Sequence, residues 1–362
     1  MMLRNEMTKC LKIAYPIIQA PMAGGVTTSK LVAETSNAGG LGMVGAGYMA
    51  PTQIRDQIKE IQKLTSKPFG INLFVPQPFD VSEDSMKAAN QALTTIRQQL
   101  HLPDKDNFGI ADYNEVLEVF KEQIQVVIEE QVPICSFTFG IPSQEVIAEL
   151  KQHNITLMGT ATTVMEAVQN EAAGMDMVVV QGSEAGGHRG GFLNQEQESS
   201  DSVGLMSLLP QVTDAITIPV VAAGGIMDGR GLAASMCLGA QGVQMGTAFL
   251  TCVESGAHPV HKEAILSISE DQTVYTRSFS GKWARGVKNH FILEMQNHEV
   301  YLPDFPVQNT LTQDIRKAAS AENNPDFMSL WSGQSTRLAK SQTVEALIEN
   351  MVAEAKKLNI NI

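Results

Sequence analysis

The chain has few basic residues and no long apolar run, and both shortages limit what it can be. Its 362 residues include 26 lysines and arginines against 39 aspartates and glutamates, which gives a formal net charge of −13. This excess of negative charge disfavours nucleic acid and anionic membranes as partners. No apolar run approaches the roughly 20 residues that a membrane-spanning helix needs, and residues 1–12 mix charges throughout, unlike a signal peptide. We therefore expect a cytoplasmic globular protein, with 43% hydrophobic residues available to build its core.

Cysteine is also scarce, and its distribution argues against disulfides and thiol chemistry. The four cysteines are scattered and form no CxxC pair: Cys10, Cys135, Cys237 and Cys252. We expect reduced thiols in or near the core. A metal site is not expected either. His258 and His261 could share one helix face, but no third ligand lies nearby, so a solvated helix start without a metal is the expectation.

Short apolar strands alternate with amphipathic helices along most of the chain, which is typical of parallel α/β proteins. The predicted strands are Pro16–Met22, Leu41–Gly45, Phe69–Val75, Ile134–Phe139, Thr156–Thr160, Met177–Gln181, Pro219–Ala223 and Gly242–Met245. The predicted helices are Ser29–Asn37, Thr52–Leu64, Met86–Leu100, Gln144–Gln152, Val164–Ala172, Leu205–Ile216, Gly231–Leu238 and Thr343–Leu358. Eight strands in one alternating run predict a (β/α)8 TIM barrel rather than an open sheet.

Two regions depart from the strand–helix repeat and suggest a second, smaller subdomain. We expect the barrel to occupy residues 1–256, with a polar, partly helical insertion at about 76–120. Residues 257–362 form a C-terminal extension that contains a basic, glycine-rich segment at 276–286. The insertion and the extension are expected to cover the mouth of the barrel, and the final helix to pack back on the barrel.

One glycine-rich loop holds the leading candidate for catalysis. Residues 181–191 follow the strand Met177–Gln181 and contain five glycines, with His188 and Arg189 among them. Glycines allow the backbone to approach a planar or anionic ligand closely, because no Cβ intervenes. A histidine in such a loop can exchange a proton near neutral pH. Arg189 is interpreted either as a second cation at the site or as a solvated loop residue.

Two further glycine turns predict a phosphate site. One strand runs into Gly224–Gly225, after which Asp228 can cap the next helix, and the following strand ends at Gly246–Thr247. If these are the seventh and eighth barrel strands, both turns lie at the carboxyl ends of the strands, where this fold most often holds phosphate. Backbone N–H groups and a threonine hydroxyl can bind phosphate oxygens without a lysine. An acidic protein can therefore hold a phosphorylated cofactor.

Taken together, these segments resemble the nitronate monooxygenase family, FMN-dependent barrels long called 2-nitropropane dioxygenases. The resemblance rests on residues 19–22 (QAPM), 37–42 (NAGGLG), 68–73 (PFGINL), 182–188 (GSEAGGH), 222–226 (AAGGI), 244–247 (QMGT), 277, 284–289 (ARGVKN) and 332–334 (SGQ). It covers most of the chain and implies FMN as the cofactor. The FMN-contacting positions that it implies are Ala20, Met22, Asn72, Gln181, Gly186, Gly187, Gly224, Gly225, Gln244, Met245, Gly246 and Thr247. His188 matches the active-site histidine of the family.

The resemblance implies oxidation of alkyl nitronates, such as propionate 3-nitronate, by O2 to carbonyl compounds and nitrite, in a detoxifying role. In this reaction the flavin carries the electrons, and His188 could either stabilise negative charge or act as the base toward a neutral nitroalkane. One alternative is an FMN-dependent enoyl-ACP reductase, a flavin barrel with a very similar loop. The other is a non-catalytic flavin-binding protein. The sequence does not indicate the oligomeric state.

Overall fold

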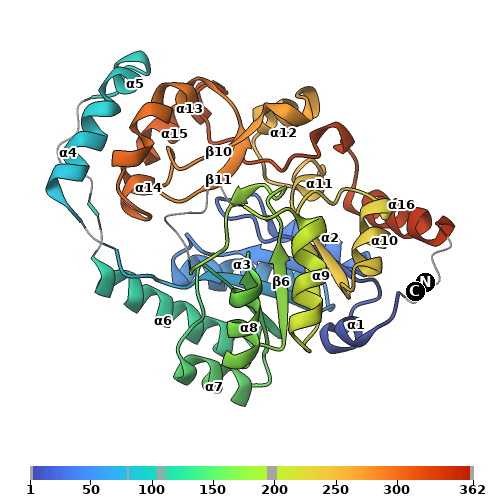
Figure 1. Ribbon diagram of the computed structural model, residues 1–362. Coiled ribbons are helices and arrows are strands. Elements are labelled where there is room, and N and C mark those ends of the chain that lie inside the picture. Colours follow the sequence, from blue (N-terminus) through green and yellow to red (C-terminus); the bar gives the residue numbers. More distant parts are fainter. Residues whose placement is uncertain (1–2, 80, 104–108, 111, 194–201, 359–362) are drawn as a thin grey trace.

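The computed structural model describes residues 3–79, 81–103, 109–110, 112–193 and 202–358, and its centre is a barrel of eight parallel strands (Figure 1). The strands lie in the order β1-β9-β8-β6-β5-β4-β3-β2, and a parallel bridge between Ile18 and Leu41 joins the first strand to the edge of the second. Their bounds are β1 Ile17–Gln19, β2 Gly42–Gly45, β3 Phe69–Phe74, β4 Ile134–Thr138, β5 Thr156–Ala161, β6 Met177–Gln181, β8 Val220–Ala223 and β9 Gly242–Met245. The predicted (β/α)8 barrel is confirmed, with all eight strands at their expected places.

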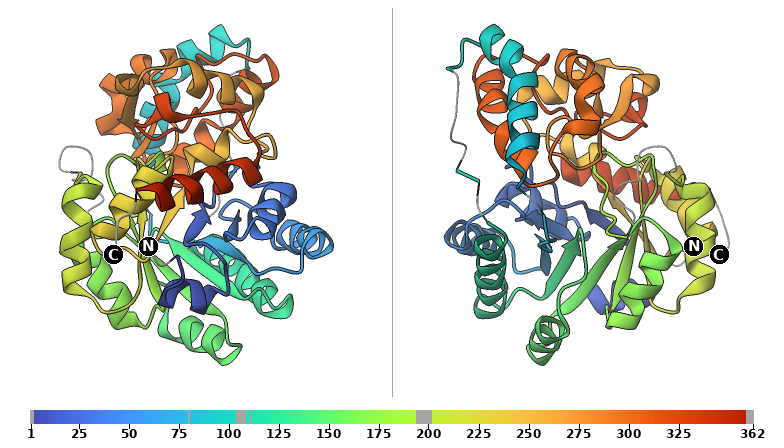
Figure 2. Two further views of the ribbon diagram at one scale, coloured as in Figure 1. Left: turned by 90° about the vertical axis from the view of Figure 1, so that its right-hand side faces the viewer. Right: turned by 60° about the vertical axis from the view of Figure 1, so that its left-hand side comes forward.

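Helices cover the outside of this barrel (Figure 2). Those between barrel strands are α2 Ser29–Asn37, α3 Pro51–Leu64, α6 Tyr113–Glu129, α7 Gln144–Gln152, α8 Val164–Ala173, α9 Leu205–Ala215 and α10 Gly229–Cys237, and α1 Glu6–Leu11 precedes them. Each predicted barrel helix lies within two residues of its expected bounds. The helix expected over Met86–Leu100 is instead two helices, α4 Glu83–Ala92 and α5 Thr94–Gln99, which meet at the fully buried Leu93.

The insertion and the C-terminal extension form a helical layer at one end of the barrel (Figure 1). Its helices from the extension are α12 Pro259–Ser267, α13 His290–Met295, α14 Val307–Leu311 and α15 Gln313–Ala321, whereas the short α11 Thr247–Leu250 directly follows β9. Leu93 and Ile96 from the insertion share one apolar cluster with Phe279, Phe291 and Leu311 from the extension. The burial of these large side chains joins two segments that are far apart in the sequence.

A small antiparallel sheet connects this layer to the barrel. It consists of β10 Thr273–Thr276, β11 Ala284–Val287 and β7 Gly187–His188 in the order β10-β11-β7. Because β7 belongs to the loop after β6, the extension lies at the carboxyl ends of the barrel strands. The basic segment at 276–286 thus contributes a strand, but to this outer sheet and not to the barrel.

The last helix, α16 Val344–Lys357, packs mainly on α10 and also on α2. Gly229 at the start of α10 allows this contact, because a Cβ there would lie 2.5 Å from the backbone oxygen of Met351. Among the described residues, no helix is both long and apolar enough to cross a bilayer.

Candidate active site

A cavity of about 210 Å³ opens at the carboxyl ends of the barrel strands, beneath the C-terminal layer. Its walls come from residues of β3, from the segments that follow β1, β6, β8 and β9 and from residues 331–335 of the extension. All thirteen residues singled out in the sequence line this cavity: Ala20, Met22, Asn72, Gln181, Gly186, Gly187, His188, Gly224, Gly225, Gln244, Met245, Gly246 and Thr247. The barrel thus brings residues that lie up to about 230 positions apart in the sequence, from Ala20 to Thr247, together around one cavity.

The loop that carries His188 is held by hydrogen bonds at both of its ends. The Gln181 amide donates to the His188 carbonyl at 3.0 Å, and its oxygen accepts from Gly190 N–H at 2.8 Å. Residues 187–188 pair with β11, and Arg189 N–H donates to Trp283. The glycine-rich stretch is therefore not a free surface loop, and its short strand fixes the direction of the imidazole.

Arg189 takes neither of the two roles expected for it. Its side chain is buried, and its guanidinium donates to the carbonyl oxygens of Gln181 and Gly182 at 3.0 Å each. These are the last residue of β6 and the first residue after it. Arg189 is thus a structural clamp between the loop and the strand end, because it points back into the backbone and away from solvent.

The imidazole of His188 has a polar contact on one side and aromatic rings around it. Its Nε2 lies 2.8 Å from the Ser280 hydroxyl, and its Nδ1 has no hydrogen-bond partner within the described part of the chain. Trp331 lies 5.3 Å from it between ring centroids, and Phe139 lies 5.9 Å away edge-on. Ser280 and the aromatic contacts orient the ring, so the nitrogen without a protein partner is Nδ1.

The charge state of His188 follows from burial and from two nearby cations. Burial, followed by the positive charges of Lys282 and Arg316, lowers its pKa to about 3. The imidazole is therefore neutral at physiological pH. Lys282 is itself buried, and its ammonium lies 4.9 Å from the centroid of the Phe139 ring and donates to the Gly191 carbonyl. The positive charge next to the cavity comes from Lys282 and Arg316 and not from the imidazole.

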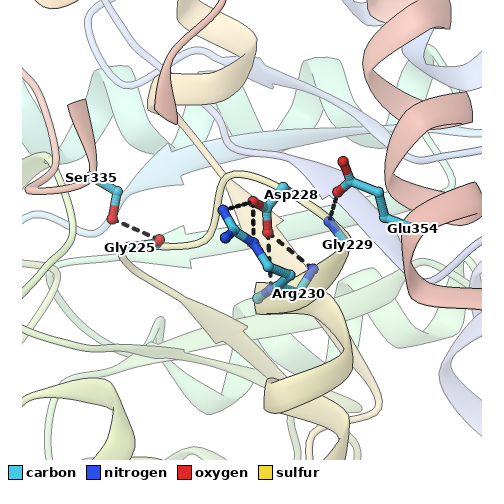
Figure 3. Close-up of polar contacts among 7 residues, drawn as sticks. Gly225, Asp228, Gly229, Arg230, Ser335 and Glu354 are labelled. Carbon is cyan, nitrogen blue, oxygen red and sulfur yellow. Dashed lines mark hydrogen bonds and ion pairs between the residues drawn. The ribbon is translucent and has the colours of Figure 1, made fainter. Parts of the chain in front are cut away.

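The turn after β8 has the geometry of an anion-binding nest. Gly224 and Gly225 both have positive φ, 120° and 69°, and the N–H groups of residues 224–227 donate no hydrogen bond within the described part of the chain. Consecutive free N–H groups in such a turn form a concave set of donors for an anion. The next N–H groups, at the start of α10, are already used (Figure 3). Asp228 caps those of Arg230 and Gly231, as the sequence predicted.

Two residues of the C-terminal extension hold this turn in place. Figure 3 shows Ser335 reaching the Gly225 carbonyl, to which its hydroxyl donates at 2.8 Å. Glu354 from α16 accepts from Gly229 N–H at 3.0 Å. The backbone of the nest is thus anchored from outside the barrel.

The turn after β9 completes the polar side of the cavity. The Thr247 hydroxyl accepts from Gly333 N–H at 3.0 Å and keeps its own proton to donate. The side-chain amide of Gln244 has no hydrogen-bond partner among the described residues. Asn72 differs, since its amide already donates to the hydroxyls of Ser136 and Thr138. Gln244 and Thr247 therefore have donors available for a ligand in the cavity, whereas Asn72 is committed to its neighbours.

Several residues that shape the site escaped the sequence analysis. They are Tyr48, Phe139, Ser280, Lys282, Arg316 and Trp331. Most come from the extension, and nothing in their spacing places them opposite a barrel loop. Phe139 has a backbone signal, a positive φ of 73°, but that conformation is visible only in the structure.

The remaining histidine and cysteine expectations need correction. His258 caps α12, but His261 is buried and not solvated: its Nε2 donates to the Trp331 carbonyl, and burial lowers its pKa to about 4. The described residues contain no group of three metal-ligating side chains. Cys135 and Cys252 are buried thiols whose pKa is raised by burial, whereas the other two cysteines are exposed and not in the core.

The fold and the cavity define a barrel enzyme with its site at the carboxyl ends of the strands. The family model for nitronate monooxygenase matches residues 4–354. A probable nitronate monooxygenase of Staphylococcus haemolyticus (strain JCSC1435) is 51% identical over 354 residues, which cover 98% of each chain. The chain belongs to the nitronate monooxygenase family and is an oxidoreductase.

Two solved structures are similar to this chain over almost its whole length. Nitroalkane oxidase from Streptomyces ansochromogenes superposes with a TM-score of 0.88 at 38% identity, covering 97% of this chain and 98% of that one. FabK from Thermotoga maritima superposes with a TM-score of 0.77 at 32% identity, covering 99% and 97%. The two relatives share the architecture, so the chemistry of this chain has to be argued from its own site.

Proposed function

We propose that the protein is an FMN-dependent nitronate monooxygenase that oxidises alkyl nitronates, such as propionate 3-nitronate, with O2 to carbonyl compounds and nitrite. The observation that carries this proposal is that one cavity combines a free backbone nest, at residues 224–227, with His188, on which the positive charges of Lys282 and Arg316 act. A detoxifying role follows if such nitronates are its substrates.

The cavity fits FMN in its chemistry. The nest of Gly224 and Gly225, together with the N–H of Gly246 and the hydroxyl of Thr247, offers donors for a phosphate. Apolar side chains, among them Met22, line the same space and suit a flat ring system. When bound, the flavin supplies the electron transfer, and the protein supplies binding, orientation and charge.

The electrostatics favour an anionic substrate. A nitronate already carries a negative charge, so no proton has to be removed from it. Lys282 and Arg316 provide positive charge beside His188, and they would attract the anion and keep the imidazole neutral. In the Nδ1–H tautomer, the Ser280 hydroxyl would donate to Nε2 in place of the Lys282 carbonyl, and neutral His188 could then donate from Nδ1 to a nitronate oxygen. A histidine with a pKa of about 3 is a poor base. We therefore propose that His188 orients the nitronate through a hydrogen bond and does not abstract an α-proton.

Nitrite release tests the proposed reaction directly. The purified protein, supplied with FMN, should release nitrite from propionate 3-nitronate and consume O2 without any nicotinamide nucleotide. The alternative enoyl-ACP reductase rests on the similarity of its loop to residues 185–188. Enoyl-dependent loss of NAD(P)H without nitrite release would establish that alternative and refute the nitronate assignment. Bound FMN without either activity would indicate the non-catalytic flavoprotein.

A further inference from the structure

A second cavity, of about 180 Å³, adjoins the first. The two cavities share Tyr48, Phe74 and Phe139 in their walls. The second is otherwise enclosed by the chain after β3, by one face of α6 and by residues 304–309 of the extension. It therefore lies between the barrel and the C-terminal layer, and aromatic rings separate it from the space around His188.

The lining of the second cavity is mostly apolar. It includes Val75, Phe79, Val116, Phe120 and Phe305. Phe305 lies 5.6 Å from Phe139 and 6.2 Å from His188, measured between ring centroids. A ligand in such a pocket binds more tightly in proportion to the apolar surface that it buries against the walls. The walls therefore stabilise a bound hydrocarbon group but contribute little binding free energy to a polar one.

Phe139 stands at the junction of the two cavities in a costly backbone conformation. It is the residue directly after β4, and its φ of 73° lies in the left-handed region, which is rare for a bulky side chain. Its N–H donates to the Gly190 carbonyl of the histidine loop. Strained residues of this type concentrate at functional sites, where the surrounding structure holds them in place. The surrounding structure therefore holds the Phe139 ring at the passage between the cavities in spite of the strain.

Lys282 lies in the wall of the second cavity, and its charge acts on His188 in the first. Its ammonium lies over the Phe139 ring at 4.9 Å. A ligand with its charged end near His188 and Lys282 would direct any apolar tail past Phe139. The two cavities together thus match an amphipathic anion, with a charged head and a hydrocarbon tail.

We propose that the second cavity is the subsite for the hydrocarbon substituent of the substrate, so that the enzyme prefers nitronates with long apolar chains. The residues that decide this preference are Phe139 and Phe305 at the passage and Val116 and Val119 on the α6 wall. This inference rests on the proposed function, but its subsite can be tested separately from turnover.

The test is a chain-length series on the FMN-loaded enzyme. Nitrite release from the nitronates of nitroethane, 1-nitrobutane, 1-nitrohexane and 1-nitrooctane gives kcat/KM for each. We expect kcat/KM to rise by about fourfold for each methylene that enters the cavity, until the cavity is filled. Val116→Trp and Val119→Trp should each lower the ratio of the octyl to the ethyl value by tenfold or more. The matched control, Glu118→Trp on the opposite side of α6, should leave that ratio unchanged.

Calorimetry with a non-reacting probe separates the two proposals. Octanoate should bind at least tenfold more tightly than butyrate, and Val116→Trp should abolish the difference. Nitrite release from ethyl nitronate with no dependence on chain length, and equal affinity for the two carboxylates, would overturn the subsite and leave the proposed function standing. Absence of nitrite release with preferential octanoate binding would overturn the function and support the subsite.

Discussion

Gly246 offers a clean test of the proposed phosphate site, because the position tolerates a side chain in the absence of a ligand. Its φ is −101°, and a Cβ there would lie 3.8 Å from the Ala20 Cβ and 3.9 Å from the Met22 sulfur, which are ordinary contacts. Both neighbours line the cavity, so the added side chain occupies ligand space. Gly225 would be a poorer choice, since its φ of 69° strains any other residue whether or not a ligand is bound.

Gly246→Val should therefore weaken FMN binding and leave the fold intact. Loss of one charge-assisted hydrogen bond to phosphate costs about 1.5–3 kcal/mol, and displacement of the phosphate by two methyl groups adds to this. The Kd for FMN should rise by roughly 100-fold or more, with Gly246→Ala intermediate. Quenching of flavin fluorescence gives the Kd, and thermal unfolding of the FMN-free proteins should give Tm values within about 2 °C. A valine variant that binds FMN as tightly as the wild type would refute the phosphate assignment.

Three further predictions concern charge and position. Glu354→Ala should raise the Kd for FMN by about fivefold, because Gly229 N–H loses its acceptor; Glu354→Gln, which keeps an acceptor oxygen, should restore most of the affinity. The kcat/KM for a preformed nitronate should show no histidine ionisation between pH 5 and 8, because the pKa of His188 is about 3. The substitution Arg316→Met should raise that pKa, which NMR can follow. An inflection of kcat/KM near pH 6.5 in the wild type that is absent from His188→Ala would contradict this prediction. Burial lowers the pKa of His261 to about 4 in the folded protein, against 6.5 for an unperturbed histidine. As the pH falls from 6.5 to 4, the unfolded chain takes up a proton that the folded protein does not, so the free energy of unfolding should fall by up to about 3 kcal/mol. Urea unfolding should show a smaller fall for His261→Gln than for the wild type.

The barrel could be predicted from the sequence because its signals are local. Strand residues such as Met177–Gln181 form short apolar runs, and the caps at Asp228 and Gly174 mark where helices begin and end. In a parallel barrel, all strand ends of one kind meet on one face. This rule brings the turn at Gly224–Gly225 and the loop at His188 to the same end of the barrel, where the structure shows them in one cavity.

The C-terminal side of the site could not be predicted in the same way. Lys282, Arg316 and Phe305 reach His188 only because β11 pairs with β7 and because the extension packs on the insertion. Such contacts depend on long-range packing, which leaves no periodic pattern in the sequence. The role of Arg189 was missed for a related reason, since its burial depends on the carbonyl oxygens of a strand end that lies seven or eight residues away.

We propose that the backbone nest at residues 224–227, whose N–H groups are free, holds the phosphate of FMN in the cavity beside His188. The most direct test compares the affinities of the FMN-free protein for FMN and for riboflavin, which lacks only the phosphate. Fluorescence titration should give a Kd for FMN at least 100-fold below that for riboflavin, because several N–H donors would act on the phosphate alone. Equal affinities for the two flavins, or no binding of either, would contradict the account.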